Sequence, residues 1–373
     1  MSVTLNGTNG LTFNDGSTQN TGATGFGFKN KIINGAMMID QRNAGASVTP
    51  ANGAYTIDRW FVAQTVASKF SVQQNAGSVT PPAGFTNYLG ATSLSAYTVG
   101  ATDQFAQRQI IEGYNVADLA YGTASAKAIT LSFQVYSSLT GTFGGALYNY
   151  NANKSYVFSY SIASANTWTQ VSITVPGDTA SALTTNNGSG LLINLSLGYG
   201  STYSTSFTGG WVSGFYGSVT GATSVVGTNG ATFYITGVQL EKGSTATSFD
   251  YRPYGTELAL CQRYYWKQTS ANGLANSNYT RFGSCVSAGT SADGTVIVNP
   301  VPMRASPTAT ISTLAVYDGT SVIAVTGITT NYSSPYILCY TMSLASSTTA
   351  GKYLEIISNN NTTTAYVDAS AEL

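Results

Sequence analysis

The sequence predicts an all-β protein with an N-terminal arm followed by two β-sandwich domains. Charged residues make up 8% of the 373 residues, against about 25% in ordinary soluble proteins. Gly (40) and Tyr (25) are abundant, which favours strands and tight turns. No stretch of useful length has helical periodicity, so doubly wound α/β folds are disfavoured.

The arm comprises residues 1–28. It contains Asn6-Gly7, Asn9-Gly10 and Asp15-Gly16, the dipeptides that best fit two-residue hairpin turns. Leu11 and Phe13 alternate with Thr12, which predicts a short half-buried strand. Such short strands bury too little to be stable alone. We therefore expect the arm to become ordered against copies of itself or a partner.

The second region, residues 29–255, has the pattern of a large β-sandwich. In the segment 128–137, Ile129, Leu131, Phe133 and Val135 share one face, as expected of a strand with one buried side. Gly, Ser, Asn and Thr clusters separate the segments. Further predicted strands are 167–175, 190–198 and 231–241.

The third region, residues 256–373, repeats this pattern on a smaller scale and predicts a second β-sandwich. "TATISTLAVYDG" (308–319) ends in an Asp-Gly hairpin signal. We expect strands as well in the segments 295–302, 334–344 and 352–358.

Charge and aromatic residues gather between the two sandwiches, in "GVQLEKGSTATSFDYRPYGTELALCQRYYWK" (237–267). We interpret this segment as a rigid joint, in which the charges hold two neutral domains together and the aromatics fill the seam. Thr256 is a reasonable N-cap for one helical turn beginning at Glu257.

Composition also excludes several classes of function. Fifteen basic and fifteen acidic residues cancel, which argues against nucleic acid as a partner. Nothing approaches ~18 consecutive apolar residues, so no membrane insertion is expected. With no histidine, Ser-His-Asp and Cys-His catalysis and His-bearing zinc sites are absent. No phosphate-binding glycine loop occurs. We expect no catalytic residue, no metal site and no cofactor.

The three cysteines are odd in number and widely spaced, without the spacing of a metal site. They are Cys261, Cys285 and Cys339. This pattern favours buried free thiols in a protein assembled in a reducing cytoplasm.

Several motifs resemble those of bacteriophage tail fibre and tail-associated receptor-binding proteins. "KNKIINGAMMIDQRNAG…YTIDRW" (29–60) and the block 232–267 resemble one domain of these proteins. "FNDGSTQNTGA" (13–23) resembles the hairpin motif that precedes it, and "VPMRASPTATIS" (301–312) resembles a C-terminal module. The frame of the first domain is also similar to carbohydrate-binding-module jelly rolls. The resemblance thus implies a β jelly-roll sandwich for residues 29–255.

The resemblance further implies a homotrimeric virion protein of the tail, assembled in the host cytoplasm, that attaches the particle to host surface glycans. Residues 1–28 would then bind other phage tail proteins. Residues 256–373 would form the distal tip, whose loops are rival candidates for receptor contact. Weak single-site contacts become firm attachment when three copies are linked.

Sugars offer apolar C–H faces and many hydroxyls, so their sites combine aromatic rings with neutral polar groups. The segment 196–218 has this composition. Its candidate glycan contacts are Tyr199, Tyr203, Trp211 and Tyr216. The alternative is that such rings belong to a core or to a subunit interface.

Charged residues also occur at both ends of the predicted jelly roll. On a strand, Asp40 and Arg42 would share a face, as would Asp250 and Arg252, while the adjacent Asp58 and Arg59 would not. We expect these six residues to form structural ion pairs that fasten the first and last strands.

Two other functions remain open. One is glycoside hydrolysis, which needs only two carboxylates, and the chain has fifteen acidic residues. A purely architectural tail adaptor that binds only protein neighbours is the other alternative. We expect a protein that is not an enzyme.

Overall fold

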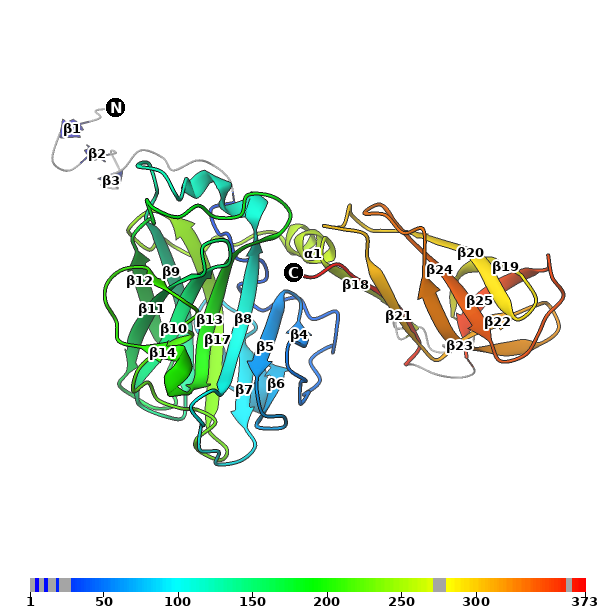
Figure 1. The fold of residues 1–373 in the computed structure, drawn as a ribbon, viewed down its shortest axis with the longest axis horizontal. Helices are drawn as coiled ribbons and strands as arrows, with labels where there is room; N and C mark the ends of the chain where they lie inside the picture. The colour runs from blue at the N-terminus through cyan, green and yellow to red at the C-terminus, as the bar shows by residue number, and fades with distance from the viewer. Residues whose placement is uncertain (1–3, 7–9, 13–17, 20–27, 271–279, 360–363) are drawn as a thin grey trace.

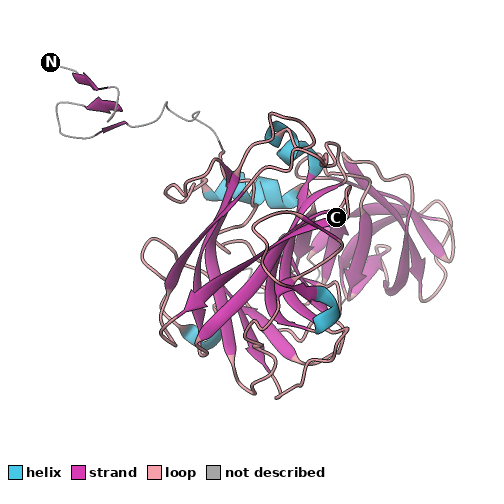
Figure 2. Ribbon diagram, turned by 60° about the vertical axis from the view of Figure 1, so that its left-hand side comes forward, coloured by secondary structure: helices cyan, strands magenta, loops and turns pink. Residues whose placement is uncertain are grey.

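The computed structural model describes residues 4–6, 10–12, 18–19, 28–270, 280–359 and 364–373. The all-β fold class is confirmed. A large sandwich and a smaller barrel lie side by side, with helix α1 (Tyr254–Gln262) and the C-terminal residues between them (Figure 1). Strands dominate both bodies, and helical segments are short (Figure 2).

The jelly-roll sandwich consists of two antiparallel sheets packed face to face. One has seven strands, in the order β15 (Val212–Ser213), β11 (Lys154–Ile162), β10 (Gly141–Asn149), β13 (Ser189–Tyr199), β8 (Gln104–Glu112), β5 (Trp60–Gln64) and β4 (Tyr55–Ile57). The other has five, in the order β12 (Thr169–Val175), β9 (Ile129–Ser137), β17 (Thr232–Lys242), β7 (Leu89–Ser93) and β6 (Phe70–Gln74). All four predicted strands of this region are thus confirmed.

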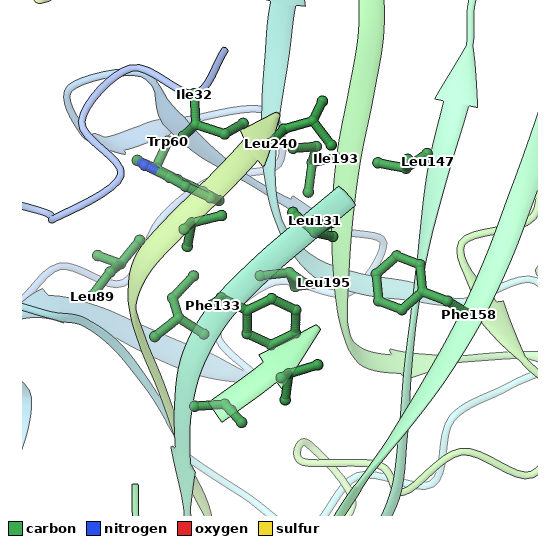
Figure 3. Close-up of a cluster of buried hydrophobic side chains, with 14 of the residues drawn as sticks. Ile32, Trp60, Leu89, Leu131, Phe133, Leu147, Phe158, Ile193, Leu195 and Leu240 are labelled. Carbon is green, nitrogen blue, oxygen red and sulfur yellow. The ribbon is translucent and has the colours of Figure 1, made fainter. Parts of the chain in front are cut away.

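The core lies between these sheets, and the sequence alternation explains it. Leu131 and Phe133 of β9 point toward Ile193 and Leu195 of β13, and all four are buried (Figure 3). Because successive residues of a strand face opposite sides, the polar residues between them lie on the outer faces. Trp60 closes one end of the core and is fully buried.

Strand β17 keeps its apolar side inward only because it contains a β-bulge. Phe233 and Ile235 are buried, and after the bulge so are Val238 and Leu240. Gly237 provides the extra residue and has φ +60°, a conformation that glycine adopts without a steric penalty. Gln239 and Glu241 therefore share the outer side with Tyr234.

Smaller elements decorate the rim of the sandwich. Strands β14 (Ser204–Thr205) and β16 (Ser218–Val219) pair in parallel. Three 3₁₀ segments are η1 (Ala76–Ser78), η2 (Gly113–Leu119) and η3 (Ser201–Tyr203).

The C-terminal body differs from the predicted sandwich, because its strands close into a six-stranded barrel. The order is β19 (Arg281–Ser287), β20 (Ser291–Val298), β24 (Ile337–Leu344), β23 (Val322–Thr330), β22 (Leu314–Tyr317) and β25 (Tyr353–Ser358), and β25 pairs with β19. A three-stranded sheet of β18 (Tyr265–Thr269), β26 (Tyr366–Ser370) and β21 (Thr308–Ser312) adjoins it. Closure leaves no unpaired barrel edge. The sequence could not distinguish the two architectures, because the strands of a barrel and of a sandwich have the same period-two alternation.

The arm forms a three-stranded antiparallel sheet of β1 (Thr4–Asn6), β2 (Gly10–Thr12) and β3 (Thr18–Gln19). Most of the predicted turn residues and of the motif 13–23 lie outside the described residues. The trimerisation and attachment roles of residues 1–28, and the domain boundaries at 28 and 255, stay predictions.

The joint has a longer helix than predicted. Helix α1 begins at Tyr254, so Thr256 lies inside it and is not its N-cap. Pro253 precedes the helix, and its carbonyl oxygen accepts hydrogen bonds from Thr256 N and Glu257 N. Proline is tolerated at this position because the first helical turn needs no N–H donor there.

Charged and aromatic residues of the segment 237–267 make contacts at the joint, as expected, while the rigidity of the joint stays a prediction. Glu112 at the end of β8 is buried, and it accepts hydrogen bonds at 3.0 and 2.6 Å from Arg263 and at 2.5 Å from the Tyr264 hydroxyl. Arg59 of the sandwich lies 3.6 Å from the centroid of the Tyr264 ring. Buried apolar residues fill the space around Tyr264. They are Ile33, Ile39 and Cys261.

The arginines of the predicted ion pairs do form ion pairs, but with glutamates rather than with the predicted aspartates. Arg42 and Arg59 both bind the carboxylate of Glu372, the Arg42 pair at 2.7 Å. Arg252 pairs with Glu257 at 3.1 Å. A glutamate side chain reaches further than an aspartate side chain, so it can cross the joint. Sequence reasoning missed Glu112 and Glu372 because both lie far from the charged segment.

The predicted aspartate partners instead bind neutral donors, and no ion pair of theirs occurs among the described residues. Asp40 accepts hydrogen bonds from Asn43 N and Gly45 N, and Asp58 from Gln41 N and Nε2. Asp250 accepts one from Asn30 N at 3.1 Å. Because Arg252 also donates to Ile32 O at 3.0 Å, the predicted fastening of the two ends of the jelly roll is present, through backbone groups.

Candidate functional site

A groove of about 390 Å³ lies on the outer face of the five-stranded sheet. Its floor is formed by outward-facing residues of β9 and β12, and its wall by the segment that follows β17 and by Phe85. Its volume is in the usual range for small-molecule sites, about 300–1,000 Å³. The lining residues are Phe85, Ser132, Gln134, Gln170, Ser172, Gly237, Ala246, Thr247, Ser248, Phe249 and Tyr251.

Three aromatic rings form one wall of the groove and pack on one another. The ring centroids of Phe85 and Phe249 are 5.1 Å apart, and those of Phe249 and Tyr251 are 4.8 Å apart, both in edge-to-face geometry. Tyr251 is 55% exposed, and its hydroxyl donates to Gly84 O at 2.6 Å. Burial raises the pKa of this hydroxyl, so Tyr251 remains neutral. The wall is therefore a fixed apolar surface open to solvent.

The local sequence explains why this wall forms. In "SFDYRP" aromatic and charged residues alternate, and in extended backbone alternate residues face opposite sides. Asp250 and Arg252 turn toward Asn30 and Glu257 in the joint. Phe249 and Tyr251 consequently face the groove. Glycine is also needed at position 237, because a Cβ atom there would lie 2.6 Å from Cζ of Phe85.

The floor supplies neutral hydrogen-bonding groups. Gln134 Nε2 donates to Gln170 Oε1 at 2.6 Å. This side-chain hydrogen bond links β9 to β12 in addition to their backbone hydrogen bonds. Neither the Ser132 nor the Ser172 hydroxyl has a hydrogen-bond partner among the described residues. Ser172 is exposed, whereas Ser132 is only 5% exposed, so the Ser172 hydroxyl is the more available to a ligand. Hydroxyl groups can both donate and accept, which suits a ligand rich in hydroxyls.

A second group of aromatics continues the same face beyond the glutamines. Tyr136 follows Gln134 by two residues on β9, and Trp168 precedes Gln170 by two residues. Their ring centroids are 5.4 Å apart, and Tyr136 stacks on Tyr234 at 5.5 Å. Trp168 donates through Nε1 to Thr80 O at 2.8 Å. The face thus presents serines, glutamines and aromatic rings in succession along its strands.

The four candidate tyrosine and tryptophan contacts lie elsewhere, on and beside the seven-stranded sheet. Tyr199 ends β13, and its hydroxyl donates to Asn194 Oδ1 at 2.6 Å. Tyr203 packs against Phe215 with a centroid distance of 6.0 Å. Tyr216 packs beside Ala146 and Val157. All three are half-buried.

Trp211 has a different set of neighbours. Its Nε1 donates to Pro176 O at 2.9 Å, and its ring contacts Tyr121 and Tyr156 at 5.8 Å each. It therefore packs against the main core. The structure does not gather these four side chains into one exposed platform, and their role as glycan contacts stays a prediction.

The barrel carries a rival hollow of about 300 Å³, lined by Arg281, Tyr317, Val322, Glu355 and Ile357. Arg281 and Glu355 form an ion pair at 2.9 Å within it. With a single aromatic ring and a charged pair, it suits a neutral sugar less well than the groove does.

Within the described residues, no three His, Cys, Asp or Glu side chains converge in a way that could hold a metal ion. No helix in the described part of the chain has the length and apolar character that a membrane span requires.

Comparison with known proteins gives structural similarities only. No protein-family model and no curated protein matches the chain. The tandem CBM22-1–CBM22-2 domain of Paenibacillus barcinonensis Xyn10C is similar, with TM-score 0.26 and 13% identity over 87% of this chain and 89% of that chain. The module TmCBM61 in complex with β-1,4-galactotriose gives TM-score 0.30 and 10% identity over 58% and 99%.

The enzymatically active domain of tailspike protein 4 from bacteriophage CBA120 gives TM-score 0.29 and 12% identity, over 52% of this chain and 21% of that chain. These proteins are all distant from the chain. Its ligand therefore has to be inferred from the chemistry of its own surface.

Proposed function

We propose that this protein binds neutral saccharides in the groove on the outer face of its five-stranded sheet. The observation that carries the proposal is the lining itself, which joins a wall of three aromatic rings to a floor of neutral amides and hydroxyls. A sugar ring offers an apolar face to the rings and hydroxyls to the floor. None of the described residues that line the groove is charged, so the groove provides no counter-ion for a charged ligand.

The lining favours binding over hydrolysis. Glycoside hydrolysis uses two carboxyl groups about 5–9.5 Å apart across the scissile bond. Among the described residues that line the groove there is no Asp or Glu. We therefore propose a protein that is not an enzyme. Incubation with host polysaccharide should release no new reducing ends, and their appearance would contradict this assignment.

The biological role proposed for this binding is host attachment by a phage tail. It is supported by the motifs in residues 13–23, 29–60, 232–267 and 301–312 that resemble those of tail fibre and receptor-binding proteins. In this role the protein is a virion component, and residues 1–28 bind neighbouring tail proteins. Linked copies would convert weak contacts with surface glycans into firm adhesion.

A glycan array with the purified full-length protein tests this function. The adhesin predicts binding to a subset of neutral host-surface glycans, and inhibition of phage adsorption by the free protein. Silence on every host glycan, together with retained binding to tail proteins, would instead favour the architectural adaptor.

A homotrimer is part of the same proposal. Light scattering on the full chain should give three times the 38.8 kDa chain mass. A stable monomer at micromolar concentration would contradict it.

A further inference from the structure

Arg108, on strand β8 of the seven-stranded sheet, differs from the other arginines of the chain. The chain has seven arginines, all of them described. Five pair with glutamates: Arg42, Arg59, Arg252, Arg263 and Arg281. Arg304 donates to the backbone carbonyl oxygens of Ala371, Asn187 and Glu372. No described carboxylate pairs with Arg108.

Neutral groups nevertheless hold the Arg108 guanidinium in one orientation. Nε donates to Asn194 Oδ1 at 2.6 Å, and Nη2 donates to Gln104 Oε1 at 2.9 Å and to the Tyr199 hydroxyl at 2.6 Å. Asn194 is itself fixed, because its Nδ2 donates to Gly217 O at 2.6 Å. These partners position the cation without neutralising it. Nη1 donates to no described group.

Aromatic rings border this cation on the outer face of the sheet. The guanidinium carbon lies 5.2 Å from the centroid of Phe215. Phe215 packs against Tyr148 at 5.1 Å, and Tyr148 against Tyr150 at 5.0 Å. On the other side, Phe61 of β5 is the cross-strand partner of Arg108. Arg108 and Phe61 are half-buried, and Tyr150 is 39% exposed, so rings and cation share an accessible surface.

We propose that this surface is a second saccharide site, in which Arg108 Nη1 donates a charge-assisted hydrogen bond to the carboxylate of an acidic sugar. The ring of the sugar would pack on Phe215 and its neighbours. Hydrogen bonds between ionised groups are about twice as strong as neutral ones, and a pre-positioned guanidinium loses little entropy on binding. The site rests on the proposed function only in that its ligand is a saccharide. It lies on the sheet opposite the groove.

The test uses a trigalacturonate and its carboxyl-reduced counterpart, titrated calorimetrically into the full-length protein. The trigalacturonate should bind more tightly than the reduced sugar, and less tightly as salt is raised. Arg108→Gln should weaken trigalacturonate binding by about tenfold or more and leave the reduced sugar unaffected. Arg108→Lys keeps the charge and should retain more affinity than Arg108→Gln. Unchanged melting temperatures check folding.

Two control variants locate the effect. Arg281→Gln removes an exposed arginine of the barrel and should leave trigalacturonate binding unchanged. Tyr251→Ala alters the groove and should also leave it unchanged. The acidic-sugar site is overturned if wild type fails to bind trigalacturonate or binds both sugars equally, if Arg108→Gln binds like wild type, or if Tyr251→Ala abolishes the binding. Failure of the groove proposal would show separately, as neutral-glycan binding that Tyr251→Ala does not change.

Discussion

Asp58 is a fully buried carboxyl group whose titration should affect the stability of the joint. Burial raises its pKa to about 7, against the opposing effects of Arg42 and of the hydrogen bonds from Gln41. Glu372 lies on the same side and raises the pKa further. The folded protein therefore keeps a proton on Asp58 at pH values where the unfolded chain has lost it.

The first prediction concerns the pH dependence that follows. Between about pH 4 and pH 7 the unfolded state binds fewer protons at this group, so its contribution to stability falls as pH rises, by at most about 1.4 kcal/mol per pH unit. The contribution is fully present below about pH 4 and lost above about pH 7. Asp58→Asn should remove it.

Urea unfolding of wild type and Asp58→Asn across pH 4–8 measures this difference, and the other carboxyl groups cancel in the comparison. Equal pH slopes for the two proteins would show that Asp58 is ionised in the folded state throughout this range.

Strand β17 illustrates what a single glycine does for an element. Gly237 has φ +60°, and a Cβ at this residue would lie 2.6 Å from Cζ of Phe85. Gly53 has φ +78°, and a Cβ there would meet nothing within 4 Å. The two glycines thus share a conformational requirement but differ in their surroundings.

The second prediction compares Gly237→Ala with Gly53→Ala. Each should lose about 1–2 kcal/mol of stability, because a left-handed conformation is unfavourable for alanine. Gly237→Ala should lose more, and should also weaken saccharide binding by displacing Phe85. Chemical unfolding and calorimetry measure both effects. Equal losses in the two variants, with binding unchanged, would mean that Phe85 can move freely away from the bulge.

At the level of elements, period-two alternation predicted four of the strands in the two sheets of the sandwich, β9, β12, β13 and β17. It predicted Ile129–Ser137 and Thr232–Lys242 to within a residue or two. It could not predict the closure of the C-terminal strands, because a barrel and a sandwich have the same alternation. The aromatic wall of the groove follows from the same alternation. Asp250 and Arg252 face the joint, so Phe249 and Tyr251, which alternate with them, face the groove. Its floor could not be foreseen, because it depends on which strands become neighbours.

The whole molecule depends on the joint between sandwich and barrel. Glu112 is buried, with a side-chain exposure of 1%, and its partner Arg263 belongs to the segment between the domains. The pair Arg281–Glu355 on the barrel is exposed, at 68% and 28%. Both pairs have similar geometry, so their environments decide how much each contributes.

The third prediction compares Arg263→Ala with Arg281→Ala. Removing Arg263 leaves a buried carboxylate with only the Tyr264 hydroxyl, and should cost about 2–3 kcal/mol. This is less than for a fully enclosed pair, because Arg263 is one-third exposed. Removing Arg281 should cost less than about 1 kcal/mol. Thermal unfolding measures both, and equal effects would contradict a stabilising role for Glu112 in the joint.

Under the proposed function, saccharide binding in the groove depends most directly on Tyr251. Tyr254 is a matched control three residues further along, with 57% of its surface exposed against 55% for Tyr251, and it does not line the groove. Calorimetric titration of wild type, Tyr251→Ala and Tyr254→Ala with a neutral glycan selected on the array separates the two positions. Tyr251→Ala should bind about tenfold more weakly, equivalent to about 1.4 kcal/mol, and Tyr254→Ala should bind like wild type. Equal affinities for all three proteins would place the neutral-glycan site elsewhere and contradict the assignment of the groove.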